Sequence, residues 1–136
     1  MDPKTEQTGD IFNMSGDFRG AIINIKSTMQ NVQQSVGDLR TDDEATRAEL
    51  MSLVEQLNQA LQSAPPEKVE QAQAVAETAK ALVETAKAEK PNRTMLQITG
   101  EGLKAAAQNL AEVMPTVVTI ASQIVLAVGR IIPGLV

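Results

Sequence analysis

The first candidates for chemistry in this chain are the clustered acidic residues Asp38, Asp42, Asp43 and Glu44. A cluster of carboxylates can bind Ca²⁺. This one lacks the alternating acidic positions and the distal glutamate of a calcium-binding loop. Its residues instead predict the start of a helix, with Thr41 as the N-cap and Glu44 at the third helical position. We therefore expect helix capping here and no metal site.

A second candidate is the short segment that contains Gly100, Gly102 and Lys104. Two glycines followed by a lysine are faintly similar to a phosphate-binding loop. The spacing differs from that of the Walker A motif, and no strand is predicted before it. We interpret Gly100 as a hinge or as the point where a helix restarts.

The chain lacks two of the side chains that enzymes use most often for catalysis. The chain has no histidine and no cysteine, which excludes the usual general base, a thiolate nucleophile, a disulfide and cysteine-ligated zinc. No Ser-His-Asp or Cys-His constellation can form. We expect a protein that is not an enzyme and that uses no cofactor and no metal.

The charge distribution bears on partners and location. The net charge is −5, with the acids concentrated in residues 37–89. Nucleic-acid binding requires a clustered basic surface, so we expect no nucleic-acid partner. The first residues are polar and contain no signal peptide, which predicts a cytoplasmic location. Association with a membrane after activation is the alternative.

The largest apolar block is Val113–Val136, in which Arg130 is the only charged residue. As a helix, it has a narrow polar strip opposite a broad apolar stripe. The stripe consists of Val117, Ile120, Ile124, Val128 and Ile131. We expect the most buried helix of a bundle. The alternative is a membrane-inserting helix, although the uncharged run spans roughly 25 Å against a hydrocarbon core of ~30 Å.

Two further apolar stripes with helical spacing predict buried helices, and they are separated by Pro65 and Pro66. The first contains Leu50, Leu53, Val54, Leu57 and Leu61. The second contains Val69, Ala72, Ala76, Ala79, Val83 and Ala86. Short loops make successive helices antiparallel. The predicted fold is all-α, a four- to five-helix antiparallel bundle with a short β-prone segment at its N-terminus.

That N-terminal segment follows two incompatible periods. Residues 12–22 alternate between apolar and polar side chains like a strand, whereas Phe18, Ile22, Ile25 and Met29 have helical spacing. We expect an extended segment up to about Gly20 and then a helix. The expected organisation is an N-terminal motif in residues 1–20 and a helical domain in residues 21–136.

The pattern Asn13-x-Ser15-Gly16-Asp17-Phe18-x-Gly20-Ala21-x-x-Asn24 resembles the amyloid-type signalling motifs of multicellular bacteria. It also resembles the effector-associated domains that accompany NLR-like ATPases in conflict systems. The resemblance implies pairing with a matching motif, on a second copy or on another protein. Charges at Asp17, Arg19 and Lys26 oppose an in-register cross-β fibre, so the resemblance points to recruitment.

We predict a non-enzymatic interaction domain that self-associates or recruits a partner through this motif. The residues expected to form it are Phe12, Asn13, Gly16, Asp17, Phe18, Gly20, Ile22, Ile23, Asn24 and Ile25. The alternative function is a membrane-inserting or pore-forming effector that uses the C-terminal helix and Arg130.

Overall fold

The computed structural model describes residues 10–39, 41–88 and 90–131, with side chains from Phe18 onward. These residues form five α-helices joined by short connections, with a 3₁₀ turn before the third helix. The elements are α1 (Asp10–Gly37), α2 (Glu44–Gln62), η1 (Pro66–Lys68), α3 (Val69–Ala86), α4 (Arg93–Gln108) and α5 (Pro115–Ile131).

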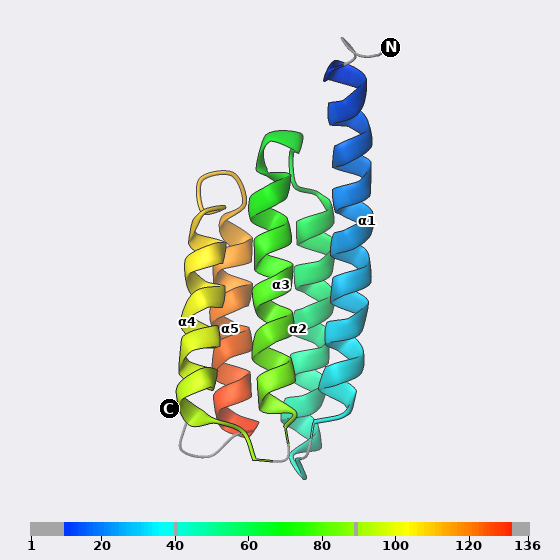
Figure 1. Ribbon diagram of the computed structural model, residues 1–136. Coiled ribbons are helices and arrows are strands. Elements are labelled where there is room, and N and C mark those ends of the chain that lie inside the picture. The colour runs from blue at the N-terminus through cyan, green and yellow to red at the C-terminus, as the bar shows by residue number, and fades with distance from the viewer. Residues whose placement is uncertain (1–9, 40, 89, 132–136) are drawn as a thin grey trace.

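The helices run nearly parallel to one long axis and alternate in direction, as Figure 1 shows. Helices α2 and α3 occupy the middle of the molecule. Helix α1 packs against both of them, α4 packs mainly on α3, and α5 packs mainly on α2. Helices α4 and α5 also contact each other. The prediction of an all-α antiparallel bundle is therefore confirmed.

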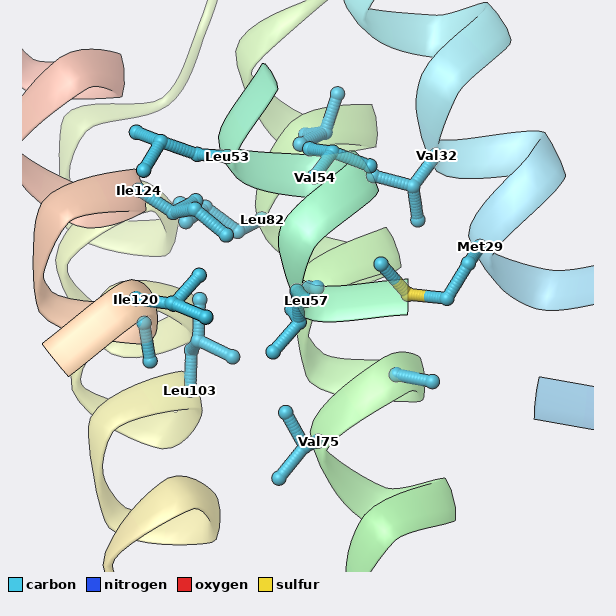
Figure 2. Close-up of a cluster of buried hydrophobic side chains, with 14 of the residues drawn as sticks. Met29, Val32, Leu53, Val54, Leu57, Val75, Leu82, Leu103, Ile120 and Ile124 are labelled. Atoms are coloured by element: carbon cyan, nitrogen blue, oxygen red, sulfur yellow. The ribbon is translucent and has the colours of Figure 1, made fainter. Parts of the chain in front are cut away.

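The core is built from aliphatic side chains that all five helices contribute. Figure 2 shows its centre, where the residues converge from facing helices. They include Met29, Val32, Leu53, Val54, Leu57, Val75, Leu82, Leu103, Ile120 and Ile124. Both stripes predicted for the second and third helices are buried along their whole length. The buried alanines of α3 allow its neighbours α1 and α4 to approach closely.

The start of α2 differs from the prediction by two residues. Asp43, rather than Thr41, is the N-cap, and its Oδ1 atom accepts a hydrogen bond from the backbone N–H of Thr46 at 3.0 Å. The hydroxyl of Thr46 donates to Asp43 Oδ2 at 2.6 Å. Thr41 instead accepts a bond from the Asp43 N–H, which shapes the turn before the helix.

Helix α4 runs through Gly100 and Gly102 without a break. The interpretation of Gly100 as a hinge or helix restart is therefore wrong. Gly100 is buried at the contact with α5, and a Cβ atom on it would lie 3.4 Å from Val125 Cγ1. This distance is an ordinary van der Waals contact, so the packing of α4 on α5 would also accept alanine at this position.

The N-terminal prediction also requires correction. Residues 10–20 belong to α1 and are helical, so they do not form an extended segment. Residues 1–9 lie outside the described part of the chain. The chain follows the helical pattern rather than the alternating one because a helix lets Phe18 and Ile22 pack against the bundle and fully buries Ile25 and Met29. The alternating pattern has no neighbouring strand among the described residues with which to pair.

Candidate interaction surface

Helix α1 is bound to the bundle through its C-terminal half. Among its described side chains, which begin at Phe18, Ile25 is the first that is fully buried, followed by Met29, Val32 and Val36. Polar contacts add to this attachment on both sides. Thr28 Oγ1 lies 3.5 Å from Glu77 Oε2 of α3, and the side-chain amide of Gln33 donates to Glu55 Oε1 of α2 at 2.6 Å. Hydrogen bonds from Gln59 and then Gln33 lower the pKa of the Glu55 carboxyl.

The N-terminal turns of α1 extend past the ends of the other helices (Figure 1). The helix begins at Asp10, and Ile25 is the first fully buried residue among its described side chains, so roughly 22 Å of helix separates these two positions. Helices shorter than about 12 residues have little stability alone in water. The attached half supplies the missing stability, since it continues the same helix.

The predicted motif is divided between the two faces of α1. Ile25 is buried in the core, and Phe18 and Ile22 are partly buried against it. Gly20, Ile23 and Asn24 are exposed. Phe12, Asn13, Gly16 and Asp17 lie on the helical backbone, and their side chains are outside the described set. The structure therefore does not gather all ten predicted residues on one surface.

Ile23 is the most exposed large hydrophobic side chain among those described, with 62% of its surface accessible. Ile98 on α4 and Leu126 on α5 follow at 58% and 55%. Single exposed apolar residues are common on soluble proteins. What sets Ile23 apart is its place on the α1 segment that leads out of the bundle.

The apolar residues predicted in the C-terminal helix are core residues. Val117, Ile120, Ile124, Val128 and Ile131 of α5 are all buried. The polar strip faces solvent, as predicted. Eight residues are buried in α5 and eight in α3. We had predicted that α5 would be the most buried helix, and α3 has as many buried residues.

Arg130 has a partner that the sequence did not reveal. Its Nη2 atom lies 2.7 Å from Glu49 Oε2 of α2, and both side chains are about half exposed. This ion pair joins the end of α5 to the first turns of α2.

No helix of the described residues combines the length and the apolar character that a membrane span requires.

A groove of about 350 Å³ opens between α4 and α5. Its lining consists of Leu96, Gln97, Gly100, Glu101, Lys104, Val125 and Leu126. Sequence reasoning missed this groove because it depends on how two helices meet.

Within the residues that the structure describes, no three acidic side chains converge as metal ligands.

No protein-family model, curated protein or solved structure matches this chain. The functional argument therefore rests on its own residues and geometry.

Proposed function

We propose that this chain is a non-enzymatic interaction domain, in which the bundle is a scaffold and the N-terminal half of α1 contacts a second copy or a partner protein. The observation that carries the proposal is the shape of α1. One helix is anchored by a buried half and its first turns extend past the other helices, while Gly20 and Ile23 are exposed on the stretch between these two parts.

A helix presented in this way suits helix-to-helix recognition. The anchored half holds the outer half in a helical conformation before binding. Preorganisation of this kind lowers the conformational entropy that association must overcome. The resemblance to bacterial recruitment motifs supports the same role, although the contact proposed here is helical and not a pairing of β-strands.

A pair of matched substitutions tests the proposal. Ile23→Ser and Ile98→Ser both replace an isoleucine about 60% exposed on a helix surface. We expect Ile23→Ser to weaken self-association or partner binding and Ile98→Ser to leave it unchanged. Size-exclusion chromatography with light scattering over a range of concentrations measures the association. Equal behaviour of the two variants would remove Ile23 from the interface and count against the proposal.

Membrane insertion through α5 stays the alternative prediction. Its test is the release of dye from anionic liposomes by the intact protein, and sustained release would favour it.

A further inference from the structure

The groove between α4 and α5 suits an uncharged, apolar occupant. Leu96, Val125 and Leu126 give it apolar walls, and Leu126 is 55% exposed. The two charged residues of the lining, Glu101 and Lys104, come from the same helix, and Lys104 Nζ lies 3.8 Å from Glu101 Oε2. Because these charges balance each other, the lining has no excess charge that would attract an ion.

The end of α5 lies close to this groove. Helices α4 and α5 run antiparallel (Figure 1), and Gly100 lies opposite Val125. The start of α4 and the end of α5 are therefore at the same end of the bundle. Ile131, the last residue that the structure describes, follows Leu126 by five residues, or about 7.5 Å of helix. The chain that follows Ile131 therefore begins within reach of the groove.

The sequence of residues 132–136, Ile-Pro-Gly-Leu-Val, matches the character of the groove, since it contains no polar or charged side chain. Pro133 cannot continue the backbone hydrogen bonding of α5. Proline followed by glycine is also favoured at the two central positions of a type II turn, which reverses the chain. After such a turn, Val136 would come level with the turn of α4 that carries Leu96 and Gln97.

We infer that residues 132–136 of the same chain occupy the end of this groove, with Val136 packed beside Leu96 and Gln97. Burial of Leu135 and Val136 against the apolar walls favours the contact. The segment then bridges α4 and α5 at one end of the bundle. This contact is separate from the N-terminal half of α1, so it goes beyond the proposed function and does not depend on it.

Disulfide cross-linking tests the placement, since the chain has no cysteine of its own. Gln97→Cys combined with Val136→Cys puts one thiol in the groove and the other on its occupant, and we expect a disulfide within one chain. Ser52→Cys combined with Val136→Cys is the matched control. Ser52 is exposed on α2, three residues after the Glu49 that pairs with Arg130. It therefore flanks the end of α5 from α2 instead of α4.

A segment held in the groove should form the disulfide with position 97 at least about tenfold faster than the one with position 52. The reason is that a fixed position raises the effective concentration of one thiol for the other. Nonreducing electrophoresis and mass spectrometry measure both rates and distinguish bonds within one chain from bonds between two. Circular dichroism melts check that both double variants keep the fold.

The remaining outcomes contradict the inference. Similar rates for the two pairs, or no disulfide at position 97, would show that the segment has no fixed place in the groove. A disulfide at position 97 that joins two chains would assign the groove to the segment of a second copy and overturn the contact within one chain. Neither result bears on the proposed function, which the Ile23→Ser and Ile98→Ser variants test separately.

Discussion

Asp43 controls the start of α2 because it receives both the backbone N–H and the hydroxyl of Thr46. We expect Asp43→Ala to lower the melting temperature, since it leaves a helix N–H without its acceptor. Asp43→Asn should lower it less, since asparagine keeps one oxygen for the backbone N–H of Thr46 but has no second oxygen for the hydroxyl. Thermal melts at neutral pH compare the three proteins. Equal melting of Asp43→Ala and wild type would show that the cap contributes nothing.

The same residue predicts a pH dependence. The hydroxyl of Thr46, followed by its backbone N–H, lowers the pKa of Asp43 below 3.8 in the folded state. A carboxyl whose pKa falls on folding adds stability at pH values above the unfolded pKa, and this contribution is lost as the pH drops through the folded value. The melting difference between wild type and Asp43→Asn should therefore change below about pH 4 and be constant above it.

Arg130 is a surface residue whose contribution to stability should be small. Its ion pair with Glu49 is about half exposed, and exposed pairs of this kind contribute about 0–1 kcal/mol. We expect Arg130→Leu and Glu49→Gln to have similar small effects, and the double variant to show no additional loss beyond the pair. Urea denaturation measures all three. A loss of several kcal/mol would mean that Arg130 does more than pair with Glu49.

At the scale of an element, α5 holds the bundle together through one face. Ile124 is fully buried and Leu126, two residues later, is 55% exposed. Ile124→Ala should lower the free energy of unfolding by about 2–5 kcal/mol, through lost burial and the cavity that remains. Leu126→Ala should change it by less than about 0.5 kcal/mol. Chemical denaturation of the two variants provides the comparison, and similar losses would contradict the packing of α5.

The glycines of α4 lead to an opposite expectation. A Cβ atom at Gly100 would make ordinary contact with Val125, and one at Gly102 would lie 3.9 Å from Thr78 Cγ2. Both sites can therefore accept alanine, which is favoured over glycine in helices by about 0.5–1 kcal/mol. We expect Gly100→Ala and Gly102→Ala to raise the melting temperature. A lowered value would point to a backbone bend at this position.

The sequence predicted the structural features that depend on residues close together in the chain, and it did not predict those that depend on contacts between distant helices. The stripes of α2 and α3 came from residues three and four apart, which a helix brings together wherever it lies. The pairing of α2 with α5 involves residues far apart in the chain, such as Glu49 and Arg130, and no local pattern encodes it. In residues 10–20 two periods competed, and only packing against the bundle decided between them. Gly100 was misinterpreted because its burial against α5 holds it inside a continuous helix, and no local pattern shows that contact.

At the scale of the whole molecule, residues 1–20 should matter more for association than for folding. Their removal takes away only one described core contact, that of the partly buried Phe18, while Ile25 and the residues after it stay in place. We expect a protein that lacks residues 1–20 to keep its helical spectrum, to melt slightly earlier and to lose self-association. Circular dichroism and light scattering measure the two properties. An unfolded deletion variant would show that the segment is part of the folding core.

The division of α1 between an attached and a projecting half means that one helix contains two cooperative units. Backbone amides near Met29 exchange with solvent only when the bundle opens globally, whereas those before Gly20 can exchange by fraying of the helix end. A partner that binds the projecting half in its helical form suppresses this fraying, and because that half is helical only while the bundle holds the rest of α1, binding also stabilises the folded bundle against global unfolding.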